Sequence, residues 1–77
     1  MDIIKTIKLA LQKAAKERRK VRTFHTLVLV YANRLEHLDP HEFCRNVGVK
    51  DAFHSEFRKM INVAHTLSEW DYSIQKR

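Results

Sequence analysis

The densest group of chemically capable side chains is a run of cations in the first third of the sequence. It places six positive charges within ten residues, opposed only by Glu17; its members are Lys13, Lys16, Arg18, Arg19, Lys20 and Arg22. Such a run neutralises nucleic-acid phosphates and releases their counterions whatever the base sequence. Two other interpretations stay open: a solvated turn whose charges favour a helix C-terminus, or a surface for acidic proteins or an anionic membrane.

Five histidines and one cysteine are the residues that suggest a metal or catalytic site. His37 and His41 are four residues apart and His41 and Cys44 three, but Pro40 breaks the first pair and no second cysteine completes a tetrahedral zinc set. A Cys–His catalytic pair fails because so short a chain cannot build a pocket around it. We therefore expect no enzyme, metal or cofactor, with Cys44 packed as a small apolar group. Three further histidines are interpreted as packing or surface residues: His25, His54 and His65.

The composition limits the classes of protein to which these residues can belong. The 77 residues make one domain, residues 1–77, and 15 Lys and Arg against 9 Asp and Glu give a net charge of +6. A single glycine and a single proline exclude hairpin-rich folds, because tight β-turns need residues that tolerate positive φ. The longest apolar run, Leu27 to Ala32, is far below the roughly 20 residues of a membrane span, and the lysines near the start do not fit a signal peptide. We expect a basic, all-α, cytoplasmic protein.

Apolar residues recur at spacings of three and four in four segments, which predicts a bundle of four helices. The first helix runs from Ile3 to Ala15, with Asp2 as its N-cap. Leu9 lies off its apolar stripe and is expected to be exposed. The second helix runs from Phe24 to Leu38, with Thr23 as the candidate cap.

The third helix has the clearest start signal. Asp39 to Glu42 reads as a capping box with Pro40 at the first helical position. Gly48 is expected to end this helix in a left-handed conformation. Asp51 is the expected cap of a fourth helix, whose apolar stripe runs from Phe53 to Leu67 and which is expected to fray near Ser68 or Trp70.

A short helix, a turn around one glycine and a longer helix resemble a helix-turn-helix. Cys44 lies four residues before Gly48, Val47 and Val49 flank that glycine, and Phe57 follows nine residues after it. The segment 39–67 is similar to the small helix-turn-helix DNA-binding proteins of bacteria and their mobile elements. It departs from them at His54, where the core position is usually Val or Ile. The register of the last helix therefore depends on whether Phe53 fills that space.

The resemblance implies that the fourth helix enters the major groove of DNA. With its apolar stripe inward, Asp51, Ser55, Arg58 and Asn62 lie on the opposite face, with His54 and Lys59 on its shoulders. Arginine can pair bidentately with guanine, and asparagine with adenine. The predicted base-reading residues are Arg58 and Ser55, ranked first, followed by Asn62 and His54. The predicted phosphate contacts are Lys16, Arg18, Arg19, Lys20, Arg22, Lys50 and Lys59.

The function predicted from these features is sequence-specific binding of double-stranded DNA by a transcriptional regulator, nucleoid-associated in a bacterium and without membrane contact. One alternative is a basic accessory subunit of a nucleoprotein complex that holds the backbone without reading bases. Another is a protein-interaction adaptor on a helix-turn-helix scaffold. Apolar residues near the C-terminus either fold back on the first helices or join Leu9 in a homodimer contact, which would suit a palindromic site; they are Trp70, Tyr72 and Ile74.

Overall fold

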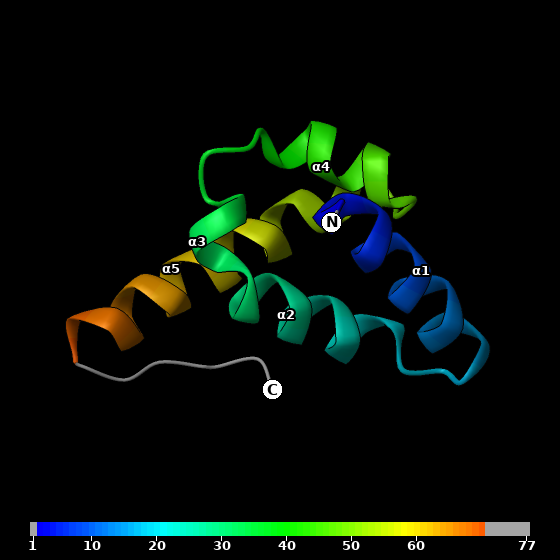
Figure 1. Cartoon of the computed structure of the whole chain (residues 1–77), viewed down its shortest axis with the longest axis horizontal. Helices are drawn as coiled ribbons and strands as arrows, with labels where there is room; N and C mark the ends of the chain where they lie inside the picture. Colours follow the sequence, from blue (N-terminus) through cyan, green and yellow to red (C-terminus); the bar gives the residue numbers. More distant parts are fainter. Residues whose placement is uncertain (1, 71–77) are drawn as a thin grey trace.

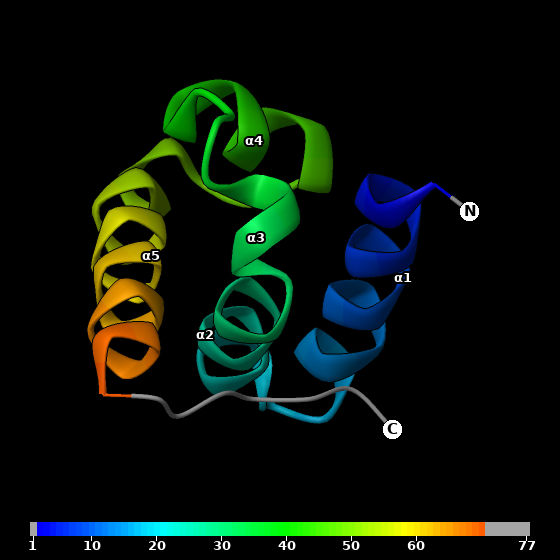
Figure 2. The same ribbon diagram turned by 60° about the vertical axis from the view of Figure 1, so that its left-hand side comes forward.

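Residues 2–70 are described by the computed structural model of the protein, and within them every regular element is helical (Figure 1). The elements in chain order are α1 (Ile3–Lys16), α2 (Lys20–Val30), α3 (Ala32–Leu35), α4 (Pro40–Val47), the 3-10 turn η1 (Asp51–Phe53) and α5 (His54–Glu69). Figure 2 shows α1, α2 and α5 side by side, with α2 in the middle and α4 lying across one end. The prediction of a small all-α bundle is confirmed.

Three of the expected helix boundaries form as the sequence predicts. The Asp2 carboxylate accepts hydrogen bonds from the N–H groups of Ile4 and Lys5, at 3.1 and 3.3 Å, and so caps α1. Asp39 Oδ2 accepts from the N–H of Glu42 at 2.9 Å and caps α4, with Pro40 in its first turn, but the Glu42 side chain does not complete the capping box with the Asp39 N–H. Gly48 ends α4 with φ 79°, in the left-handed region. These three ends are fixed by residues next to them in the chain.

The second predicted helix differs from the structure at its start and in its middle. Thr23 is not its cap: α2 begins at Lys20, because Arg18 (φ 59°) has already reversed the chain and the Arg19 N–H bonds to Ala14 O at 2.8 Å. The helix also does not continue unbroken to Leu38, because the backbone turns at Tyr31 and restarts as α3. This turn lets Tyr31 and Leu35 both be buried in the core.

The expected cap of the last helix is also wrong. Asp51 opens the 3-10 turn η1, and α5 starts at His54 with no side-chain cap. The Asp51 carboxylate instead accepts a hydrogen bond from His41 Nδ1 at 2.7 Å. The Asp51 carboxylate therefore binds a side chain on α4 instead of capping the last helix.

Aromatic rings connect the helices at the centre of the core. The Phe43 ring centroid lies 4.6 Å from that of Phe57 and 6.0 Å from that of Phe24, joining α4 to α5 and α2. Cys44 is fully buried beside them, as predicted, and this burial raises the pKa of its thiol to about 11. Leu9 is 55% exposed, also as predicted. None of the described helices combines the length and the apolar character needed to span a bilayer.

Candidate nucleic-acid interface

The helix-turn-helix expected from the sequence is formed by α4, the turn around Gly48, and α5. Val47 and Val49 are both buried on the two sides of Gly48, so they anchor the turn as predicted. A Cβ atom added at Gly48 would lie 3.9 Å from the Lys8 Cε atom, which is ordinary contact. Glycine is therefore required there by its positive φ rather than by lack of space.

The register of α5 is settled by the 3-10 turn that precedes it. The turn η1 brings the Phe53 ring to 5.1 Å from that of Phe24, so that Phe53 fills the space against α2. His54 is displaced toward α4, where its ring stacks on His41 with 4.2 Å between centroids. Its Nδ1 lies 2.8 Å from the Asp51 carbonyl oxygen. His54 thus lies at the junction of α4 and α5, and its side chain is half-buried.

Polar side chains line the solvent-facing side of α5. Ser55, Arg58 and Asn62 are all exposed, whereas Phe57 and Ile61 are buried on the opposite side. Lys59 is exposed too and forms an ion pair of 3.2 Å with Glu56 one turn earlier. Thr66, which is not among the predicted base-reading residues, is exposed four residues after Asn62 and continues the row. Its position one turn beyond Asn62 is the signal that would have identified it.

Arg58 is a charged side chain without a charged partner in the described part of the chain. It lies with Asn62 at a surface depression of about 280 Å³, whose other wall is the segment from Glu36 to Pro40. Glu36 itself is paired with His65 Nε2 at 2.7 Å. The exposed guanidinium of Arg58, with its five N–H donors, is therefore accessible from solvent.

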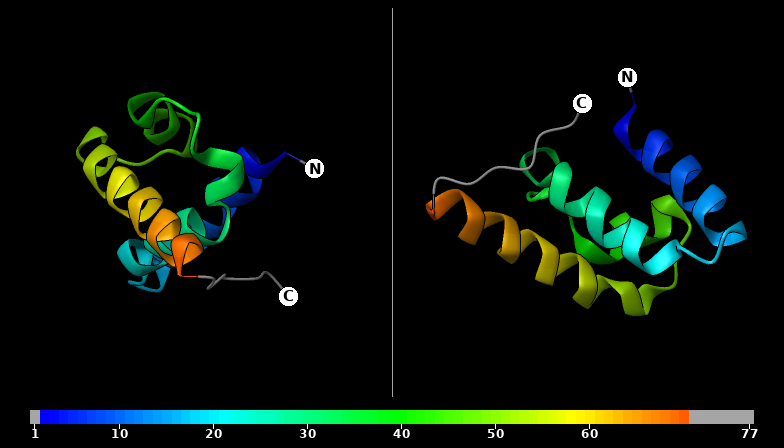
Figure 3. Two further views of the ribbon diagram at one scale, coloured as in Figure 1. Left: turned by 90° about the vertical axis from the view of Figure 1, so that its left-hand side faces the viewer. Right: turned by 90° about the horizontal axis from the view of Figure 1, so that it is seen from below.

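The cationic run spans the end of α1, the turn to α2 and the start of α2. The helix α2 lies alongside α5 (Figure 3), and its first two turns contact the start of α5. Lys20 Nζ lies 5.8 Å from the centroid of the Phe53 ring, within the range of a cation–π contact. His25 Nε2 lies 2.8 Å from Glu56 Oε1, which ties the next turn of α2 to the first turn of α5. One predicted phosphate contact, Lys20, therefore lies beside the start of the predicted base-reading helix.

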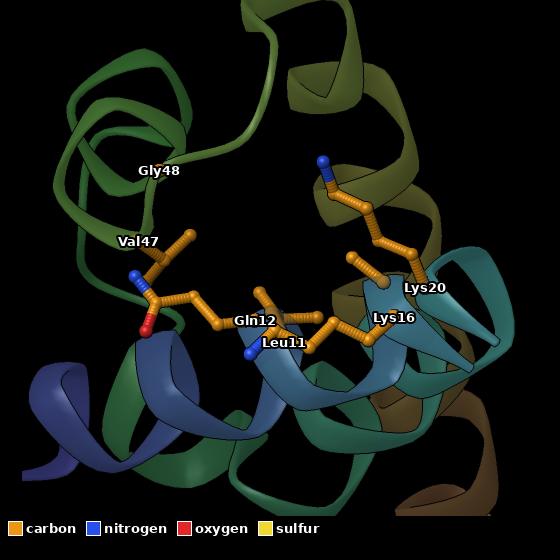
Figure 4. A pocket seen from close by; sticks show the side chains of 7 residues that line it. Leu11, Gln12, Lys16, Lys20, Val47 and Gly48 are labelled. Atoms are coloured by element: carbon orange, nitrogen blue, oxygen red, sulfur yellow. The ribbon is translucent and has the colours of Figure 1, made fainter. Parts of the chain in front are cut away.

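Two shallow surface depressions border this turn. One, of about 650 Å³, is lined by Arg18, Arg19, Lys20, Val21, Arg22 and His25. The other, of about 430 Å³, lies between α1 and the turn after α4, and Figure 4 shows Lys16, Lys20 and Gln12 around it with Gly48 opposite. Lys50, in the turn itself, is exposed. Cations thus border the helix-turn-helix turn from the side of α1 and α2.

Within the cationic run, one cation is already paired. Arg19 forms an ion pair with Glu17, and this hydrogen bond holds the pKa of the Glu17 carboxyl below its usual value. In residues 2–70, no carboxylate lies within ion-pair distance of the other five cations of the run, which are Lys13, Lys16, Arg18, Lys20 and Arg22. Their charge is therefore available to a polyanion.

The residues predicted to form a dimer contact are only partly described. Leu9 on α1 and Trp70 at the end of α5 are 55% and 66% exposed. In the bundle, α2 lies between α1, which carries Leu9, and α5, which ends at Trp70 (Figure 2). Tyr72 and Ile74 lie outside the described residues. The dimer stays a prediction.

Residues 1–69 match the model of a protein family described as an HTH-like domain. No curated protein and no solved structure shows a significant match to this chain. Because the family model covers most of the sequence, the chain belongs to the HTH-like domains. This membership supports the helix-turn-helix interpretation and indicates DNA binding in general, on a fold that is generally not enzymatic.

Proposed function

We propose that this HTH-like domain binds double-stranded DNA sequence-specifically, with α5 in the major groove, and acts as a transcriptional regulator. The observation that carries the proposal is the placement of Lys20, the first residue of α2 and a member of the cationic run, beside Phe53 and the start of α5. A helix that reads bases needs such neighbours, because phosphate contacts fix its position and register on the duplex. A cytoplasmic, nucleoid-associated protein is the corresponding proposal for its location.

Base readout is assigned to the exposed polar row of α5. Arg58 would pair bidentately with guanine and Asn62 with adenine, each contributing about 1–3 kcal/mol of discrimination. The Ser55 hydroxyl donates to Ala52 O at 3.2 Å, so it would accept from a base rather than donate to one. His54 would contribute from the α4–α5 junction, where its side chain is half-buried and its ring stacks on His41. Arg58 remains the first choice because it is exposed and unpaired.

Phosphate binding is assigned to seven cations: Lys16, Arg18, Arg19, Lys20, Arg22, Lys50 and Lys59. If all seven contact phosphates, log K should fall with log salt with a slope of about −6. Arg19 and Lys59 must first give up their ion pairs with Glu17 and Glu56. Exposed ion pairs of this kind contribute little to stability, typically below about 1 kcal/mol. Exchanging the carboxylate partner for a phosphate therefore costs little free energy.

The test is selection from a random duplex library at two salt concentrations, with the wild-type protein and two arginine variants. We expect enrichment of a short motif, and Arg58→Ala should relax the preference at one position of it. Arg34→Ala is the matched control, since Arg34 is an exposed arginine on α3. A palindromic motif, together with a dimer mass in light scattering, would support two copies that associate through Leu9, Trp70, Tyr72 and Ile74.

A second candidate function follows from the same cationic turn. A basic accessory subunit of a nucleoprotein complex would hold the backbone through these residues without base contacts. Binding that is abolished by moderate salt and enriches no motif would favour it over the regulator. Absence of binding to any duplex would favour a protein-interaction adaptor.

A further inference from the structure

The side chains of His41, Asp51 and His54 gather where α4 and α5 begin, and of these three only His54 is among the proposed DNA contacts. One potential ligand atom from each of the three lies within 4.8 Å of the other two. They come from the first turn of α4, the first residue of η1 and the first residue of α5. The turn around Gly48 therefore closes a cluster whose two histidines are thirteen residues apart in the chain.

The hydrogen bonds of this cluster fix the tautomers of both neutral imidazoles. His41 Nδ1 lies 2.7 Å from Asp51 Oδ1, and a carboxylate only accepts, so this nitrogen donates. His54 Nδ1 lies 2.8 Å from the Asp51 carbonyl oxygen, so it donates as well. Each ring therefore keeps its lone pair on Nε2. His54 is held as metal-binding histidines are, with its second N–H donated to a backbone carbonyl. The His41 ring must turn and give up its hydrogen bond to Asp51 before that carboxylate can face the same ion as His41.

We propose that His41, Asp51 and His54 bind a divalent transition-metal ion of the zinc class. Imidazole nitrogen with a carboxylate is a ligand set that suits Zn²⁺, whereas Mg²⁺ prefers an oxygen shell. Ligand distances of about 2.0–2.2 Å place tetrahedral ligands roughly 3.4 Å apart, so the three atoms must move closer together. The side chains of His41 and Asp51 can make this movement, since they are 43% and 68% exposed.

The proposed site departs from the expectation of no metal that was drawn from sequence spacing. That expectation considered His41 with His37 and with Cys44, but Cys44 is fully buried in the core and the partner of His41 is His54. A bound ion would join α4 to α5 directly across the turn. It would thereby stabilise the helix-turn-helix by mass action, because the unfolded chain does not hold the three ligands together.

The first experiment is calorimetric titration of the tag-free, chelator-treated full chain with zinc chloride near neutral pH. We expect one equivalent to bind, and His41→Gln and His54→Gln should each weaken binding by at least about 10–100-fold, the range that loss of a second-shell partner already costs. His65→Gln and His25→Gln are matched controls, because each removes a histidine that is paired with a carboxylate elsewhere in the bundle. Both controls should bind zinc like the wild type, and magnesium chloride should give no binding.

A second measurement separates loss of metal binding from loss of the fold. Cobalt(II) added to the wild type should give visible absorption bands of nitrogen-containing coordination, and Asp51→Asn should shift or weaken them while circular dichroism reports on the fold. The proposal is overturned if the wild type binds no zinc up to about 1 mM, or if His41→Gln and His54→Gln bind it as tightly as His65→Gln does. Neither measurement contains DNA, so the result stands apart from the proposed function.

Discussion

His25 Nε2 lies 2.8 Å from Glu56 Oε1, which makes this pair the polar link between the middle helix of the bundle and the first turn of α5. The same carboxylate also accepts from Lys59 Nζ at 3.2 Å through its other oxygen. Glu56 thus orients a lysine on the outer side of α5 and a histidine on α2. Because both donors favour the charged form, the hydrogen bond from His25 and then that from Lys59 hold the pKa of Glu56 below its ordinary value.

The lowered pKa of Glu56 predicts a loss of stability in acid. A carboxyl whose pKa is lower in the folded state stabilises the fold above its unfolded pKa, and this contribution is lost as pH falls through the folded pKa. We therefore expect the free energy of unfolding of Glu56→Gln to depend less on pH than that of the wild type below about pH 4.5. Urea unfolding at several pH values measures this. Gln12→Ala, at an exposed position on α1, changes no titratable group and is the control, which should keep the wild-type dependence.

The turn between α1 and α2 contains a backbone conformation that costs free energy. Arg18 has φ 59°, in the left-handed region that side chains with a Cβ atom disfavour. Arg18→Gly should therefore raise the free energy of unfolding by about 0.5–1 kcal/mol, since relief of this strain exceeds the added freedom of the unfolded chain. Arg22→Gly removes the same charge within α2 and should lower stability by about 1 kcal/mol. Equal effects of the two substitutions would contradict the argument.

Gly48 tests the same effect of positive φ in the opposite direction, because here a glycine would be replaced by a residue with a Cβ atom. Its φ of 79° ends α4, and an added methyl group would meet only the far end of the Lys8 side chain, at 3.9 Å. Gly48→Ala should thus cost about 1 kcal/mol through the backbone alone. Gly48→Asn should cost less, because asparagine tolerates this region better. Thermal unfolding compares the two, and an alanine variant as stable as wild type would show that the turn can adopt another conformation.

The elements that the sequence predicts correctly are those fixed by near neighbours. Asp2, Asp39 and Gly48 act on N–H and C=O groups within a few residues, and the apolar stripes of α1, α4 and α5 have the helical period. The break at Tyr31 has no such signal, because neither glycine nor proline marks it. It follows from burial of Tyr31 and Leu35 in a core that other helices complete.

The candidate sites divide in the same way. Exposure of Ser55, Arg58 and Asn62 follows from the period of α5 alone, so the sequence sufficed for that face. Aspartate is a residue type typical of helix N-caps, yet the Asp51 carboxylate accepts a hydrogen bond from His41 on α4. The stack of His41 on His54 depends on how the turn around Gly48 is folded. No spacing rule for metal ligands would select two histidines thirteen residues apart with a helix end between them.

The proposed division between base readout and phosphate binding predicts opposite behaviour for two cations. Arg58→Ala should weaken binding to the selected motif by about 1–3 kcal/mol while leaving affinity for unrelated DNA nearly unchanged, because a base contact carries the specificity. Lys20→Ala should weaken binding to both kinds of DNA alike and make the salt slope shallower by about 0.9, because one phosphate contact is lost. Fluorescence anisotropy on motif and scrambled duplexes across a salt series measures both quantities. If both variants lower the affinity for the two duplexes equally, Arg58 contacts the backbone and the base-reading role of α5 is wrong.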